Sequence, residues 1–155
     1  MNQRTERAEG RILALDLGAR RIGLALSDEL GLTAQGLETM ERTNMREDLT
    51  RLERLAAEKG VSLILIGNPL RMNGAEGRQS GWVRQFAEKL SAHTGRVVKL
   101  WDERLTTVEA ERVLRQSGIS PQKRKRAVDR LAAVILLQNY LGAAAAGGPV
   151  VDPAE

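Results

Sequence analysis

The sequence contains no cysteine and only one histidine, His93. Disulfides, thiolate metal sites and cysteine nucleophiles are therefore excluded, as is a zinc site built from several histidines. His93 ends a polar segment before a glycine, a position that favours capping of helix carbonyls over catalysis. If the protein is an enzyme, its chemistry rests on carboxylates, and carboxylates without imidazole suit Mg²⁺ or Mn²⁺.

Aromatic residues make up only 3% of the chain, which argues against a sheet that binds RNA by stacking its bases. No apolar run approaches the ~20 residues needed to cross a bilayer. The first ten residues are polar and lack the apolar core of a secretion signal. We therefore expect a cytoplasmic protein with no membrane partner.

The length of 155 residues suits one domain with a substantial core. Lys and Arg total 24 against 20 acidic residues, which gives a net charge of +4. This excess is compatible with a polyanionic partner and equally with a solvated basic surface. We expect a flexible leader over residues 1–10, one folded domain over 11–141 and a flexible Ala/Gly/Pro-rich tail over 142–155.

The spacing of apolar residues predicts an α/β protein. Strands are expected over residues 12–15, 22–26, 31–40, 61–66 and 97–101. Helices are expected over residues 44–59, 78–93 and 106–116, with a last helix through 128–140 that follows the basic run 122–126. The first three strands should form an antiparallel meander, and the later strand–helix alternation should add parallel neighbours.

Three acidic residues occur where such a sheet would let them converge. Asp16 directly follows the first apolar run, where an ionised carboxylate is costly unless hydrogen bonds, a cation or solvent compensate it. Glu103, beside Asp102, follows the last strand, and Asp129 lies at the start of the last helix. If the first and last strands are neighbours, their ends open on one crevice.

Three carboxylates in one crevice repel one another unless divalent cations neutralise them. Two Mg²⁺ or Mn²⁺ ions about 4 Å apart would do so, and would activate water for phosphodiester cleavage. Nearby basic residues would then bind the phosphates of a nucleic acid. These residues are Arg20, Arg21, Arg71, Arg104, Lys123, Arg124, Lys125 and Arg126.

Each acid also has a structural interpretation. Asp16 could accept backbone N–H bonds in a turn. Asp102 could form a surface ion pair with Arg104. Asp129 could complement the dipole of the last helix from its first turn. The combination of the three acids with basic neighbours is what favours a catalytic site.

Four segments, taken together, resemble the YqgF/RuvX family. They are DLGARRIGLALSD (16–28), LILIGNPLRMNG (63–74), LWDERLTTVEAE (100–111) and KRAVDRLAAVILLQNYL (125–141). The resemblance implies a ribonuclease H-like fold: a five-stranded mixed sheet in the order 3-2-1-4-5, with only strand 2 antiparallel and helices on both faces. It also implies that Asp16, Glu103 and Asp129 are the catalytic metal ligands.

The chain departs from this family in one loop. The family's usual Gly-Leu-Pro-Leu-Asn-Met-x-Gly appears here as GNPLRMNG, so Asn68 and Arg71 replace an apolar residue and an asparagine. The shape of the loop should survive these two changes. Its role in substrate choice is open.

Family members are related to Holliday-junction resolvases and are described as pre-16S rRNA nucleases. The resemblance therefore implies a metal-dependent endonuclease that processes the 5′ end of pre-16S rRNA, acting as a monomer or homodimer. One alternative is a resolvase for branched DNA, which should be dimeric. Another is a non-catalytic RNA-binding or transcription-linked module. The sugar-kinase/actin fold also begins with strand, Asp-x-Gly, strand, but needs two such domains, and 155 residues cannot supply both.

Overall fold

Five strands form one mixed sheet in the order β3-β2-β1-β4-β5. They are β1 (Arg11–Leu17), β2 (Arg21–Ser27), β3 (Ala34–Glu41), β4 (Val61–Asn68) and β5 (Val97–Asp102). Strand β2 is antiparallel to both of its neighbours, and β1, β4 and β5 run parallel. The predicted strand order and the single antiparallel strand are confirmed.

The computed structural model describes residues 10–69, 77–102, 112, 115–116, 118 and 120–145, with the backbone alone for residues 121, 124–130 and 145. Most of the helix expected over 106–116 lies outside these residues. Among the helices that the model describes, none is long and apolar enough to cross a membrane.

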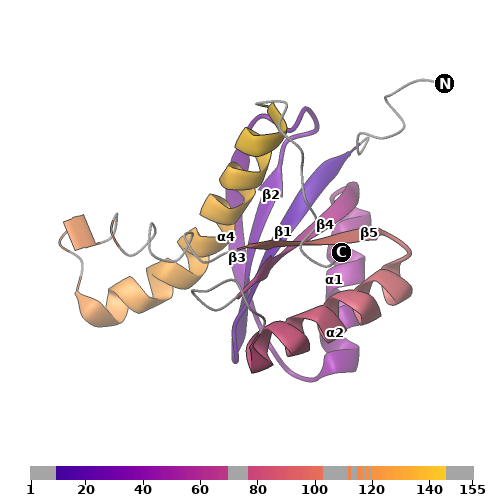
Figure 1. The fold of residues 1–155 in the computed structure, drawn as a ribbon, viewed down its shortest axis with the longest axis horizontal. Coiled ribbons are helices and arrows are strands. Elements are labelled where there is room, and N and C mark those ends of the chain that lie inside the picture. The colour runs from indigo at the N-terminus through magenta and orange to yellow at the C-terminus, as the bar shows by residue number, and fades with distance from the viewer. Residues whose placement is uncertain are drawn as a thin grey trace.

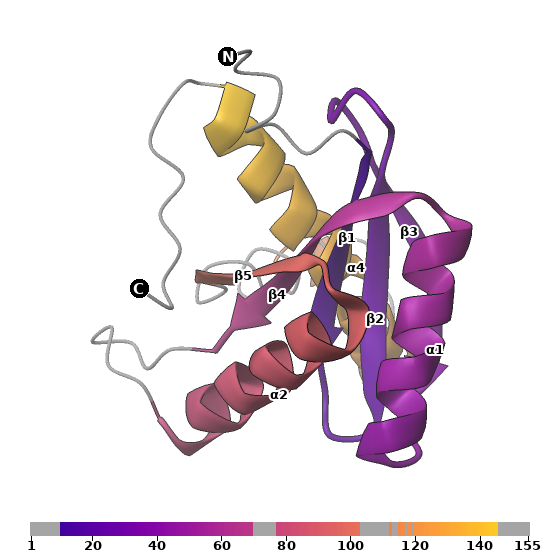
Figure 2. The ribbon, with the colours of Figure 1, turned by 90° about the vertical axis from the view of Figure 1, so that its right-hand side faces the viewer.

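Helices cover both faces of the sheet. Helices α1 (Met45–Glu58) and α2 (Arg78–Thr94) pack on one face, and α4 (Pro121–Ala145) packs on the other (Figures 1 and 2). The two faces carry separate apolar clusters, one centred on Leu52, Phe86 and Leu90 and the other on Leu136 and Leu137. Both layers are needed because β1 and β4 are apolar along both faces, as expected for central strands of a mixed sheet.

Residue alternation in β1 assigns each side chain to one of these layers. Leu13, Leu15 and Leu17 belong to the cluster under α1 and α2, and Ile12 and Ala14 belong to the cluster under α4. Because successive side chains of a strand point to opposite faces, the next even-numbered residue lies on the α4 face as well. That residue is Asp16.

The start of α1 matches the sequence prediction. The Asn44 side chain accepts a hydrogen bond from the Glu47 backbone N–H at 2.9 Å, as an N-cap should. The Glu47 carboxylate accepts from the Thr43 hydroxyl at 2.8 Å. His93 lies in the last turn of α2, and its Nε2 atom is 3.0 Å from Glu53 Oε2 of α1. The histidine that was expected to cap helix carbonyls therefore contacts a side chain of α1.

Several element boundaries differ from the prediction. Strand β3 begins at Ala34, because the Asp28 carboxylate accepts hydrogen bonds from the backbone N–H groups of Leu32 (2.7 Å) and Thr33 (2.9 Å) and shapes a turn there. Helix α4 begins at Pro121, where a missing N–H does no harm, so the basic run belongs to the helix. The helix continues to Ala145, beyond the predicted end of the folded domain at residue 141.

Candidate active site

Asp16 lies within β1, one residue before its end. The strand is longer than the apolar run 12–15 suggested, and Asp16 takes part in the ladder opposite Gly23 of β2. The side chain is half-buried. Its place on the α4 face separates it from the leucines of β1, which lie on the other face. Asp16 is therefore a strand residue, and its position at the carboxyl end of the strand is confirmed.

Glycines border Asp16 on both sides. Gly23 lies opposite it on β2. On β4, Ile66 lies opposite Leu15, so the next residue in the same parallel register is Gly67. Neither neighbour carries a side chain that could cover the carboxylate. We call this part of the α4 face, where the two strands beside Asp16 carry no side chain, the notch.

Strand β5 ends at the same edge of the sheet, and its last residue, Asp102, precedes Glu103. Trp101 lies opposite Gly67, packs on the α4 side and meets the Tyr140 ring edge-on at 5.2 Å between centroids. Leu100 belongs to the opposite cluster, so alternation places Asp102 on the α1/α2 face, away from Asp16. Glu103 follows directly but lies outside the described residues.

Asp129 is the ninth residue of α4 rather than a residue of its first turn. The explanation as a helix-dipole acid is therefore wrong: the first turn of α4 contains no acidic residue, and dipole effects fade within that turn. Asp129 lies four residues, about one helical turn, before Ala133. Ala133 is fully buried against the sheet.

A carboxylate at this notch fits a hard divalent cation, which prefers oxygen ligands. The described residues contain no group of three or more acidic or histidine side chains gathered for a metal. Of the predicted ligands, Glu103 and the Asp129 side chain lie outside the described part, so only Asp16 is placed with its side chain.

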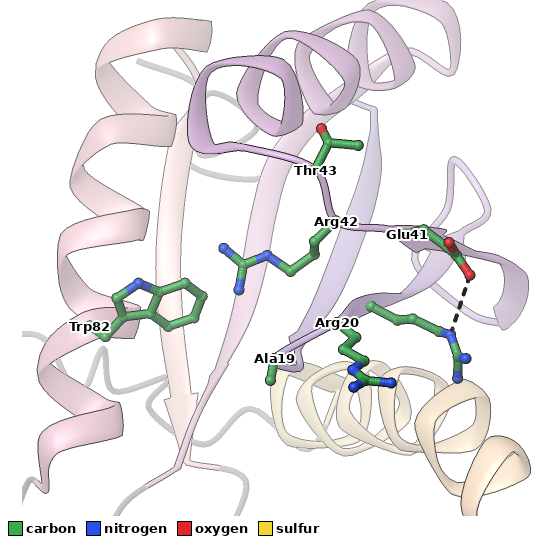
Figure 3. Close-up of a pocket in the computed structure, with 7 residues that line it drawn as sticks. Ala19, Arg20, Glu41, Arg42, Thr43 and Trp82 are labelled. Atoms are coloured by element: carbon green, nitrogen blue, oxygen red, sulfur yellow. Dashed lines mark ion pairs between the residues drawn. The ribbon is translucent and has the colours of Figure 1, made fainter.

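The basic residues predicted to bind nucleic acid are placed in part. Arg20 and Arg21 line a pocket of about 630 Å³ at the β1–β2 turn (Figure 3). Lys123 is exposed in the first turn of α4. The next three residues of the basic run, Arg124, Lys125 and Arg126, follow in the same helix with only their backbone described, and Arg71 and Arg104 lie outside the described residues.

The pocket also contains residues that the sequence analysis did not select. Arg42 follows β3, and its guanidinium lies 4.4 Å from the centre of the Trp82 ring (Figure 3). Trp82 shares one side of α2 with Phe86 and Leu90, at spacings of four residues. Those two are fully buried, whereas Trp82 is half-buried at the rim of the pocket.

A buried acid supports this pocket. Asp48 of α1 is 1% exposed, and its Oδ2 atom lies 3.5 Å from Arg42 Nε. The sequence held a signal for it, because Asp48 falls with Met45, Leu49 and Leu52 on the apolar stripe of the helix. An acid at such a position is buried and needs a partner.

Comparisons with known proteins agree with this architecture. The sequence profile of a family described as RuvX, Holliday junction resolvase, matches residues 10–143. A protein of Symbiobacterium thermophilum is 47% identical over 139 residues, covering 90% of this chain and 96% of its own. One of Koribacter versatilis is 52% identical over 132 residues, covering 85% and 86%. Both are named "Putative pre-16S rRNA nuclease".

Two solved structures share the fold. The Thermus thermophilus RuvC in complex with Holliday junction substrate superposes with a TM-score of 0.54 at 14% identity, covering 88% of this chain and 96% of its own. The Fowlpox virus resolvase in complex with Holliday junction DNA gives 0.53 at 13% identity, covering 86% and 98%. At these identities the likeness concerns the fold, which is the ribonuclease H-like fold of such resolvases.

Proposed function

Because this chain belongs to the RuvX family, a family of nucleases, we propose that it is a cytoplasmic, divalent-metal-dependent endonuclease that processes the 5′ end of pre-16S rRNA. The observation that carries the proposal is the position of Asp16. Its carboxylate is half-buried at the carboxyl edge of β1, in a glycine-bordered notch on the face covered by α4. Ligands bind at this edge in many α/β sheets.

In this proposal Asp16, Glu103 and Asp129 hold Mg²⁺ or Mn²⁺, in two sites. Bound metal would activate water and stabilise the leaving oxygen of a phosphodiester. Gly23 and Gly67 add no side chain beside the Asp16 carboxylate, and this supports its role as a ligand. Arg20, on the turn that follows β1, and Arg21, the first residue of β2, would bind phosphates beside the scissile bond.

Ribosomal precursor RNA is our first candidate substrate, because the two relatives that match most of this chain are named as pre-16S rRNA nucleases. Branched DNA is the second candidate, favoured by the family description and by the shared fold of the two resolvases. Both substrates present the same phosphodiester chemistry, so the metal site alone does not distinguish them.

The decisive experiment compares the wild-type protein with Asp16→Asn in Mg²⁺ and in Mn²⁺. Each protein is incubated with an RNA that spans the 5′ end of 16S rRNA and its precursor extension, and separately with a four-way DNA junction. We expect the wild-type protein to cleave the RNA, and Asp16→Asn to lose at least 100-fold in rate, because removing one precise electrostatic contribution to a transition state costs about 10²–10³.

Asp28→Asn is the matched control. Asp28 ends the same family segment as Asp16, but its carboxylate binds backbone N–H groups of the β2–β3 turn. This variant should cleave at the wild-type rate. Cleavage that survives in Asp16→Asn would refute the metal site, and cleavage of the junction alone would reassign the protein to the resolvases. A protein that cleaves neither substrate but binds RNA would support the non-catalytic alternative.

A further inference from the structure

Arg42 is fixed by three different elements. Its Nη1 atom donates to the Gly18 carbonyl at 3.1 Å, at the end of β1. Its Nε atom faces Asp48 of α1 at 3.5 Å, and its guanidinium lies over Trp82 of α2. The side chain is only 16% exposed. A long side chain held in this way has already lost its rotamer freedom, so a ligand that binds it loses little further entropy.

The Asp48 carboxylate is buried beside Arg42 with only one of its oxygens hydrogen-bonded to the described part of the chain, which is energetically costly. Its Oδ1 atom accepts hydrogen bonds from the backbone N–H (3.1 Å) and hydroxyl (3.3 Å) of Thr43. Its Oδ2 atom is buried and, among the described residues, has no hydrogen bond and only the charge contact with Arg42. A half-satisfied buried carboxylate is rare in a native protein and calls for an explanation. Holding Arg42 at the rim of a pocket is that explanation.

The pocket beside Arg42 is open and basic. It is lined by Ala19, Arg20, Arg21, Glu41, Arg42, Thr43 and Trp82 (Figure 3). Arg21 lies 3.7 Å from the exposed Glu41 carboxylate, an ion pair that water largely screens. Arg20 is exposed and forms no ion pair with any described residue. No acceptor within the described part of the chain engages Nη2 of Arg42. An anion can therefore bind here.

The position of the pocket relates it to Asp16. Gly18, which binds Arg42, lies two residues after Asp16, roughly 7 Å along an extended strand. Asp16 is on the α4 face of the sheet edge, and Trp82 belongs to the α1/α2 layer. The β1–β2 turn lies between them and also carries Arg20. A strand that reaches Asp16 and crosses this turn would therefore enter the pocket.

We infer that the Arg42 pocket binds a phosphodiester of the substrate strand on the α1/α2 side of the sheet edge, next to the cleavage site. Arg42 and Arg20 are its phosphate ligands, and Asp48 and Trp82 are positioning residues. The identity of the strand as substrate rests on the proposed function, but binding of nucleic acid in the pocket does not.

The test measures binding in the Asp16→Asn background, where cleavage cannot interfere. The probe is a short fluorescein-labelled single-stranded RNA, and its anisotropy is followed over a range of salt concentrations. Arg42→Gln should weaken binding about tenfold, the effect of one charge-assisted hydrogen bond. It should also flatten the dependence of log K on log salt by about 0.7, the value for one phosphate contact on a single strand.

Asp48→Asn separates positioning from charge. Arg42 keeps its charge in this variant but is held less firmly, so affinity should fall while the salt dependence stays unchanged. Arg54→Gln is the matched control, because it removes one arginine from the exposed side of α1, outside the pocket. If folded Arg42→Gln binds no worse than Arg54→Gln, the inference is overturned.

A second measurement leaves Arg42 intact and so does not depend on the stability of that variant. In Trp101→Phe protein, Trp82 is the only tryptophan. Its fluorescence should change saturably with the RNA and with inorganic phosphate, but not with chloride at the same ionic strength. An unchanged Trp82 signal when anisotropy shows the RNA to be bound would refute the pocket. If the pocket binds RNA but the wild-type protein cleaves neither substrate, the proposed function is refuted and the inference about the pocket stands.

Discussion

Asp16 and Gly23 lie directly opposite each other in the antiparallel pair of β1 and β2. The two residues occupy the same face of the sheet, so no side chain of β2 stands directly beside the carboxylate. Gly67 likewise leaves the neighbouring position on β4 without a side chain. The shape of the candidate site is therefore determined by residues that have no functional group of their own.

A side chain at Gly23 should reduce activity by more than its effect on stability explains. Gly23→Ala should slow metal-dependent cleavage, and Gly23→Val should slow it further, by at least tenfold, because a side chain would stand beside Asp16. Because Gly23 is buried, the added side chain should also lower the melting temperature, so rates are compared at a temperature where each variant is folded. Cleavage rates and circular dichroism melting curves provide the measurement. Wild-type cleavage by Gly23→Val would contradict the notch.

Metal binding should raise the melting temperature through Asp16. A ligand that binds only the native state stabilises it by about 2.7 kcal/mol at a concentration 100 times its dissociation constant. Wild-type protein titrated with Mn²⁺ should show this rise, and Asp16→Asn should lose most of it. The matched variant Asp28→Asn should respond as the wild type does. An equal rise in all three proteins would place the metal elsewhere.

The β1–β2 turn should tolerate no side chain at Gly18. A Cβ atom there would lie 2.7 Å from the Arg21 carbonyl oxygen, which accepts the Gly18 N–H at 2.9 Å. Gly18→Ala should therefore destabilise the protein by about 1–3 kcal/mol, as overpacking does. It should also weaken RNA binding, since the turn carries Arg20. Urea unfolding would measure the loss, and Gly81→Ala is a suitable control because its Cβ would meet nothing within 4 Å.

Asn68 and Ser80 form a buried polar pair whose members should be coupled. The Ser80 hydroxyl donates to Asn68 Oδ1 at 2.6 Å, and both residues are fully buried. Asn68 Nδ2 has no hydrogen-bond partner in the described part of the chain. Ser80→Ala should cost about 1–3 kcal/mol by leaving Asn68 unsatisfied. The double variant Asn68→Leu/Ser80→Ala should recover most of that loss, because it removes both polar groups. Additive losses in urea unfolding would contradict this coupling.

The β2–β3 turn should open in acid. Hydrogen bonds, first from the Thr33 N–H and then from the Leu32 N–H, hold the pKa of Asp28 below its ordinary value of 3.8. A lowered folded pKa means that the carboxylate stabilises the fold above the unfolded pKa and loses this effect as pH falls through the folded pKa.

The amide NMR signals of Leu32 and Thr33 should therefore titrate with a midpoint below pH 3.8. The difference in melting temperature between wild-type protein and Asp28→Ala should shrink over the same range. Glu29→Ala, an exposed acid in the same loop, should show no such pH dependence. A midpoint at or above 3.8 would refute the assignment.

The sequence by itself determined the sheet, because the apolar periodicities are strong. It determined the strand order through the four family segments, which occur in order from residue 16 to residue 141 and imply the family's fold. It also selected Asp16, since an acid that follows a buried apolar run needs a special environment. Helix α1 and its Asn44 cap were predictable because their signals are local and each depends on a few neighbouring residues.

Only the tertiary structure decided which side chains lie on the same face of the sheet or line the same pocket. The faces of β1 and β5 put Asp16 and Asp102 on opposite sides, and the true start of α4 moved Asp129 out of the first helical turn. The Arg42 pocket combines residues from three elements that are distant in sequence. Such contacts depend on packing and register, which no local pattern encodes, because a shift of one residue in a strand reverses the face of every side chain.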